Sequence, residues 1–141
     1  MTELDDKIDA VAKAAQAARG KAYAPYSDFP MGAAVLTADG VTIPGALVEN
    51  VSLGLAMCAE RVALFTAVTQ VRHPVILALC SKRTNDELTF PCGACLQVAL
   101  EIGGTELIVV ATDPDGAIDH STVAELLTRA PKRHSPSAAP K

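Results

Sequence analysis

Residues 56–101 read AMCAERVALFTAVTQVRHPVILALCSKRTNDELTFPCGACLQVALE. The first part, 56–71, contains no helix-breaking residue and repeats apolar side chains at helical spacing, which predicts a helix. Residues 75–81 form a short apolar run typical of a buried strand, and Pro91 suits the first turn of another helix that continues to about residue 101. Helices and strands that alternate in this way favour an α/β fold.

The segments before this stretch extend the same pattern. Apolar side chains recur at helical spacing over 3–19, which predicts a first helix that lies on a sheet. After an irregular loop, the apolar runs 31–37 and 41–48 flank an Ala-Asp-Gly turn signal and predict a β-hairpin. Pro44 cannot donate a backbone hydrogen bond, so its strand is expected at a sheet edge or at a bulge.

The segments after it complete the predicted fold. We expect a strand over 106–112, a turn at 113–116, a short strand over 117–120 and a short helix over 122–127. Together these elements predict an α/β three-layer sandwich with a central mixed sheet of about five strands. Residues 1–129 are expected to form a single domain, and the Pro- and Ser-rich residues 130–141 a disordered tail.

Composition and charge exclude several classes of function. The chain has 141 residues and a formal net charge of −4, which argues against a nucleic-acid partner. No apolar run approaches the length of about 20 residues that spans a bilayer, so no membrane association is expected. The acidic N-terminus lacks a secretion signal, and we expect a cytoplasmic protein. Its four cysteines then indicate metal ligands or redox groups rather than disulfides.

Three of these cysteines lie at predicted helix starts. Cys58 precedes Ala59 and Glu60, and Cys92 and Cys95 are three residues apart on one helix face. Helix N-termini favour the thiolate form that zinc requires, and three protein ligands leave a fourth zinc position open for water. A carboxylate at Glu60 can move protons beside such a site, an arrangement known from zinc deaminases.

The chain resembles the cytidine deaminase family in both cysteine motifs, in YAPYSDFPMGAA at 23–34 and in Val-Glu-Asn at 48–50. This resemblance implies one Zn²⁺ per chain and hydrolytic deamination of cytidine, deoxycytidine or a closely related cytosine nucleoside to the uracil form plus ammonia. It implies an aminated pyrimidine as the small-molecule substrate and a homo-oligomer, with a tetramer favoured. The resemblance implies the following roles: Cys58, Cys92 and Cys95 bind the metal, Glu60 is catalytic, Phe29 packs on the pyrimidine ring, Glu49 binds a ribose hydroxyl, and the backbone at Ala59 reads the base.

Three leucines depart from the family pattern. Leu47 replaces an Asn that helps to hold the sugar, and Leu53 replaces a Tyr that often reaches a neighbouring active site. Leu96 replaces an Arg beside the last zinc cysteine, which leaves Arg61 to offset the negative charge of three thiolates. These changes keep open a deaminase of a modified cytosine compound such as blasticidin S, or of another aminated heterocycle.

Three further alternatives remain at this point. Cys-Gly-Ala-Cys also resembles a thioredoxin-type redox motif, although a thioredoxin-type site does not need the Cys-Ala-Glu motif. A closed structural zinc needs a fourth ligand, and Cys80 is expected to be a core residue instead. A zinc-stabilised binding module without catalysis is disfavoured by the retained Glu60.

The three histidines are expected to be surface residues: His73, His120 and His134.

Overall fold

The computed structural model describes residues 2–133. The elements follow in the order α1 (Glu3–Arg19), β1 (Gly32–Thr37), β2 (Thr42–Ala46), the 3₁₀ helix η1 (Leu53–Leu55), α2 (Ala59–Thr69), β3 (Pro74–Cys80), α3 (Gly93–Gly103), β4 (Ile108–Thr112), β5 (Ile118–Thr122) and α4 (Val123–Leu126). Within the predicted tail, residues 134–141, including His134, lie outside the described residues. No helix in the described part of the chain is both long and apolar enough to cross a membrane.

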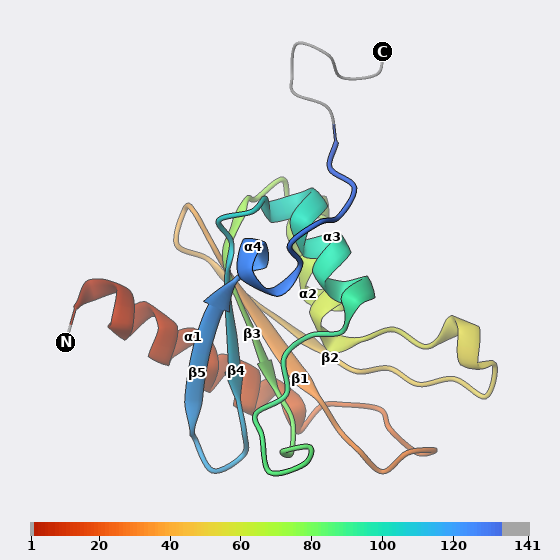
Figure 1. Cartoon of the computed structure of the whole chain (residues 1–141). Helices are drawn as coiled ribbons and strands as arrows, with labels where there is room; N and C mark the ends of the chain where they lie inside the picture. The colour runs from red at the N-terminus through yellow and green to blue at the C-terminus, as the bar shows by residue number, and fades with distance from the viewer. Residues whose placement is uncertain (1, 134–141) are drawn as a thin grey trace.

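The five strands form one mixed sheet in the order β2-β1-β3-β4-β5 (Figure 1). β3 and β4 run parallel, and the other neighbouring strands run antiparallel. The predicted hairpin is present, because β1 and β2 pair around a turn at Gly40. Pro44 lies in β2 at the edge of the sheet, as its missing N–H group requires.

Helices cover both faces of the sheet. Alternate residues of β3 face opposite sides: Ile76, Ala78 and Cys80 belong to a core with α1, whereas Leu77 belongs to a core with α2 and α3. The predicted α/β three-layer sandwich is therefore confirmed. Cys80 is fully buried in the α1 layer, as predicted for a core cysteine.

Two glycines allow the helices to approach the sheet closely. A Cβ atom on Gly32 would lie 2.1 Å from the backbone nitrogen of Arg19 in α1. A Cβ atom on Gly45 would lie 2.4 Å from the carbonyl oxygen of Ala59 in α2. Both distances are too short for a side chain, so Gly45 in particular fixes the start of α2 against β2.

The predicted starts of two helices are wrong by a few residues. α2 begins at Ala59 rather than at residue 56, because the backbone of Met57 is extended and exchanges two hydrogen bonds with Val48. α3 begins at Gly93 rather than at Pro91, and Cys92 is its extended N-cap residue. Each helix therefore begins directly after a cysteine.

The predicted end of α2 is also wrong. The helix ends at Thr69, and Val71 adopts the left-handed conformation with φ 57°. Val71 N–H donates to the carbonyl of Val68 and Arg72 N–H to that of Ala67, which is the hydrogen-bond pattern of a Schellman cap. Glycine is the usual residue in this conformation. Because valine occupies the position here, the sequence gives no signal that the helix ends.

Candidate metal and catalytic site

Three cysteines meet where α2 and α3 begin. Cys58 is the N-cap residue of α2, Cys92 is the N-cap residue of α3, and Cys95 lies in the first turn of α3. α2 and α3 pack side by side on one face of the sheet (Figure 1). The Sγ atoms of the three cysteines lie within 4.8 Å of one another. The structure thus brings together the three predicted metal ligands.

The cysteine group has the chemistry and size of a zinc site. Sulfur ligands of tetrahedral zinc lie about 3.8 Å apart, given Zn–S bonds of about 2.3 Å. Within residues 2–133, no fourth His, Cys, Asp or Glu joins the group, and Cys80 lies in the core on the other side of the sheet. The three sulfurs therefore fit a zinc ion with one open coordination position.

Glu60 follows in the first turn of α2 and is almost completely buried, with 2% of its surface exposed. Its Oε1 atom has no hydrogen-bond partner among the described residues. Burial raises the pKa of the Glu60 carboxyl to about 7, and the nearby charge of Cys58 adds to this rise. A buried carboxylate oxygen without a partner is costly, which indicates that a ligand or water completes its hydrogen bonds.

Arg61 neutralises part of the charge of the sulfurs. Its Nη2 atom donates a hydrogen bond to Cys58 Sγ at 3.3 Å. The pKa of Cys58 is lowered to about 5, mainly by its interaction with the Cys95 thiol and to a smaller extent by Arg61. Burial of Cys58 opposes this shift. The hydrogen bond to Cys58 in turn raises the pKa of Arg61. Arg61 thus favours the thiolate form of Cys58 that a metal requires.

The predicted substrate-binding segment lies directly beside these cysteines. Val48 forms backbone bridges both with Tyr23 and with Met57, which precedes Cys58 in the chain. Glu49 is half-buried, and its Oε1 accepts hydrogen bonds from the N–H groups of Tyr26 and Ser27 at 3.0 and 3.2 Å. The Ser27 hydroxyl, with these N–H groups, holds the pKa of Glu49 below its ordinary value, although its slight burial opposes this.

The other residues named from the sequence have different surroundings. Phe29 is half-buried in the loop after Ser27, and Ala59 is fully buried against Gly45. Leu47 and Leu53 line a pocket with Glu49, whereas Leu96 is buried in the core between α3 and the sheet. The binding roles of Phe29, Glu49 and Ala59 stay predictions.

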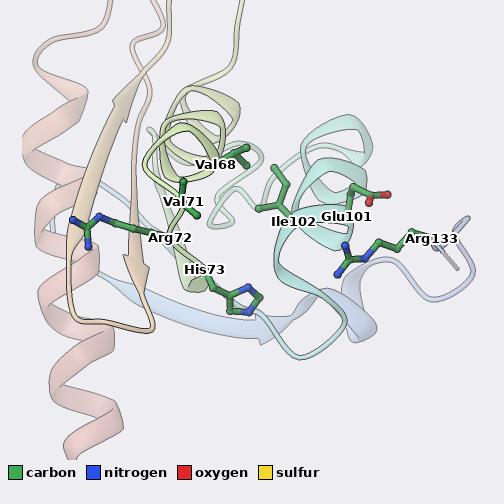
Figure 2. A pocket seen from close by; sticks show the side chains of 7 residues that line it. All are labelled: Val68, Val71, Arg72, His73, Glu101, Ile102 and Arg133. Carbon is green, nitrogen blue, oxygen red and sulfur yellow. The ribbon is translucent and has the colours of Figure 1, made fainter. Parts of the chain in front are cut away.

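A second hollow, of about 460 Å³, lies at the opposite ends of α2 and α3 (Figure 2). None of the predicted site residues lines it. Arg72 points away from its centre and pairs with Asp39 on the hairpin turn. His73 is exposed here and His120 is exposed on β5, as predicted for surface histidines. This hollow carries no group that resembles the thiol cluster.

Comparison with known families decides between the interpretations of this site. The sequence profile described as "Cytidine and deoxycytidylate deaminase zinc-binding region" matches residues 5–112. The chain belongs to this family. The match includes both cysteine motifs and Glu60, so a zinc-dependent deaminase is the enzyme class, as predicted.

Relatives of the cytidine deaminase family agree with this result. The chain is 44% identical over 115 residues to a cytidine deaminase of Halalkalibacterium halodurans, which covers 82% of this chain and 86% of that protein. It is 47% identical over 96 residues to a cytidine deaminase of Mycobacterium tuberculosis, which covers 68% of this chain and 71% of that protein. The crystal structure of cytidine deaminase from Burkholderia pseudomallei superposes with a TM-score of 0.81 at 41% identity and covers 92% of this chain and 99% of that one.

These similarities do not favour the alternatives. The family is described by the zinc-binding region of deaminases, and the relatives are named as deaminases rather than as redox proteins or binding modules. None of the relatives named above acts by its name on blasticidin S. The five-stranded sheet and flanking helices match those of the solved cytidine deaminase.

Proposed function

We propose that this chain catalyses the hydrolytic deamination of cytidine, deoxycytidine or a closely related cytosine nucleoside. The reaction adds water at the ring carbon that carries the amino group and releases ammonia and the uracil form. The observation that carries this proposal is the buried Oε1 of Glu60, which has no hydrogen-bond partner within residues 2–133 and lies beside three clustered thiols. The names of the relatives support cytidine as the substrate.

Cys58, Cys92 and Cys95 hold the zinc ion in this proposal. When bound, zinc supplies Lewis-acid activation of a water molecule at neutral pH. The N-terminal ends of α2 and α3 place their positive dipole ends at the thiolates, and Arg61 donates to Cys58. The fold thereby stabilises three negative sulfurs in a small volume.

Glu60 moves the protons. Its carboxylate accepts one proton from the attacking water and delivers it to the ring nitrogen next to the reacting carbon. It then transfers the second proton of that water to the amino group, which leaves as ammonia. A pKa near 7 suits both directions of transfer, because the group can accept and release a proton at neutral pH.

The substrate is oriented by three groups from the neighbouring segments. Phe29 packs on the pyrimidine ring, Glu49 accepts a hydrogen bond from a sugar hydroxyl, and the backbone at Ala59 reads the base. Support for these roles comes from the bridges of Val48, which hold the Glu49 segment beside the start of α2. Ala59 lies between Cys58 and Glu60, so its backbone lies next to the reacting groups.

Glu60→Gln tests the proposal. The amide cannot accept a proton, so we expect ammonia release from cytidine and deoxycytidine to fall by a factor of about 10³ or more. Zinc content should stay near one ion per chain, because Glu60 is not a ligand. Glu101→Gln, an exposed position near the far end of α3, is the matched control and should keep full activity. An active Glu60→Gln enzyme would contradict the assignment.

The proposal includes a homo-oligomer, with a tetramer favoured. The segment between β2 and α2 extends away from the sheet (Figure 1) and exposes Val51, Leu53 and Leu55. Leu53 alone has 83% of its surface exposed, and α2 adds the exposed Phe65 and Val68. Apolar side chains gathered in this way are typical of surfaces that bind another protein chain.

The extent of the domain and its location are also part of the proposal. Residues 1–129 form the single deaminase domain, since the elements from Glu3 to Leu126 share one sheet and its two cores. A chain ended after Arg133 that loses activity would contradict this. The thiolate ligands need reducing surroundings, which favours the cytoplasm, and cell fractionation tests this location.

A further inference from the structure

The loop between β3 and α3 leads directly into the cysteine group. Its residues 81–91 connect the end of β3 with Cys92, the N-cap residue of α3. Cys95 is fully buried in α3, and Cys58 follows Met57, whose backbone forms a β-bridge. Cys92 is exposed and lies where the loop and the helix meet. Of the three predicted metal ligands, Cys92 therefore depends most on the loop before it.

This loop is closed by hydrogen bonds within itself. The backbone N–H groups of Thr84 and Glu87 each donate to the carbonyl of the other at 3.0 Å. Asn85 and Asp86 between them have φ angles of 52° and 62°, a conformation that Asn and Asp favour in two-residue hairpin turns. The hydroxyl groups of Thr84 and Thr89 form a further hydrogen bond at 2.9 Å. The loop therefore forms one small bonded unit.

Arg83 joins this unit to the turn that follows β4. Its Nε atom donates to Asp113 Oδ2 at 2.9 Å, and its Nη1 atom donates to the carbonyl of Asp86 at 3.1 Å. Asp113 is buried, and its Oδ1 atom accepts the N–H groups of Asp115 and Ala117. Because β3 and β4 run parallel, the loop and the turn lie at the same end of the sheet (Figure 1). One guanidinium thus binds the loop to a buried anchor.

Only two residues separate this unit from Cys92. Phe90 packs against the core between the sheet and the helices α2 and α3, and Pro91 is buried. Proline also has a fixed φ angle, so this short connection has little freedom. Loss of Arg83 would leave the buried Asp113 without its cation, which favours a rearrangement of the loop and the turn. A shift of the loop would therefore be passed on to Cys92.

We infer that Arg83, through its ion pair with Asp113, is a positioning residue for the zinc ligand Cys92. The inference rests on the zinc site of the proposed function. Arg83 acts here through the loop, whose movement it limits, rather than through contact with the metal. Groups that hold a metal ligand in place strengthen metal binding, because the ligand stays in the geometry that the ion requires. The ion pair should therefore slow the loss of zinc.

The test measures the rate at which the zinc-loaded protein loses its metal to a chelator under native conditions. Arg83→Met removes the charge and the donors but keeps a long side chain, and we expect zinc to be lost at least about fivefold faster. Arg83→Lys keeps the positive charge and should recover part of the wild-type rate. Thr84→Val removes only the hydroxyl that reaches Thr89 and should give a smaller increase.

Two controls separate this effect from a general loss of stability. Lys82→Met changes an exposed cation of the same loop, and Arg72→Leu breaks the ion pair with Asp39 near the other end of α2. Both variants should lose zinc at the wild-type rate. In the cobalt-substituted protein, the thiolate-to-cobalt absorption per metal ion should be weaker in Arg83→Met than in either control, because Cys92 is one of the three thiolates that produce it.

The outcomes separate this inference from the proposed function. Zinc loss from Arg83→Met at the wild-type rate, or an equal acceleration in the two controls, would overturn the inference and leave the proposed function intact. Equal rates in Arg83→Met and Arg83→Lys would also overturn it. If Arg83→Met does not fold, Thr84→Val takes its place, and an unchanged rate in that variant would overturn the inference. A wild-type chain that binds no zinc and releases no ammonia from cytidine or deoxycytidine would overturn both.

Discussion

Among the described residues, Arg61 is the cation that donates a hydrogen bond to one of the three sulfurs. Three thiolates and one Zn²⁺ carry a net negative charge, which makes bound water a poorer acid. Leu96 cannot offset that charge, because it is apolar and buried in the core. Arg61 therefore carries this task, and the pKa of Cys58 reflects its presence.

Replacing Arg61 with leucine should weaken both zinc binding and turnover. We expect a loss of about 10- to 100-fold in kcat/KM and faster loss of zinc to a chelator, as for other residues that support metal ligands. Arg61→Lys keeps the charge and should recover part of both. Arg72→Leu, at the other end of α2, is the control and should leave both quantities unchanged. Equal behaviour of the Leu and Lys variants would show that charge is not the cause.

Sequence predicts the reacting residues of this site better than the binding residues. Cys58, Cys92, Cys95 and Glu60 follow from short spacings at helix starts, which are local features. The partners of Glu49 do not follow in this way, since backbone N–H groups of the 21–30 loop reach it across a long separation in the chain. Backbone donors leave no mark in the side-chain pattern, so no sequence signal identifies them.

At the scale of elements, the contact between β2 and α2 holds the site in place. Gly45→Ala would put a methyl group 2.4 Å from the carbonyl of Ala59, so the start of α2 must move. We expect a loss of about 1–3 kcal/mol in the free energy of unfolding, measured with denaturant at fixed zinc. Activity should fall as well, because Cys58 and Glu60 flank Ala59.

A matched glycine variant isolates the effect of this contact. Gly20 ends α1 with ordinary helical backbone angles, and a Cβ atom there would meet only the carbonyl of Ala17 at 3.6 Å. Gly20→Ala should therefore change stability by no more than about 0.5 kcal/mol. Equal losses in the two variants would mean that close approach at Gly45 is not what fixes α2.

The types of elements follow from the sequence, and their ends do not. Periodicity predicts α1, whose apolar side chains are buried, and a short apolar run predicts β3. Periodicity also predicts α2, although its apolar Phe65 and Val68 are exposed. The ends depend on contacts that periodicity does not record: Met57 pairs with Val48 before α2, and Val71 forms a left-handed cap after it. Valine is a poor choice for that conformation, so the usual rule for helix ends does not apply here.

For the whole molecule, the exposed apolar residues lead to a prediction about assembly. Size-exclusion chromatography with light scattering should give about four chain masses for the zinc-loaded protein. Leu53→Asp and Leu55→Asp should lower that mass, because a buried charge opposes association. The exposed Lys82→Asp is the control on another loop and should leave it unchanged. A pure monomer of the wild-type chain would contradict the homo-oligomer.

The order of the strands is the part of the fold that the sequence alone leaves open. Hairpins such as β1-β2 follow from a local turn signal, but the position of β1 between β2 and β3 does not. The parallel pairing of β3 with β4 depends on α3 crossing over the sheet between them. These choices come from packing between distant segments, which only the folded chain displays.

The central position of β1 bears on how the protein reaches and keeps its native state. Val35 pairs with Leu77, although β2, η1 and all of α2 lie between them in the chain. Pairings of such distant segments slow folding, because a long loop must close before they form. β3 lies between α2 and α3 in the chain, so we expect the three sulfurs to come together only after β3 has paired, late in folding. Bound zinc should therefore lower the unfolding rate, whereas the folding rate should be the same with and without zinc.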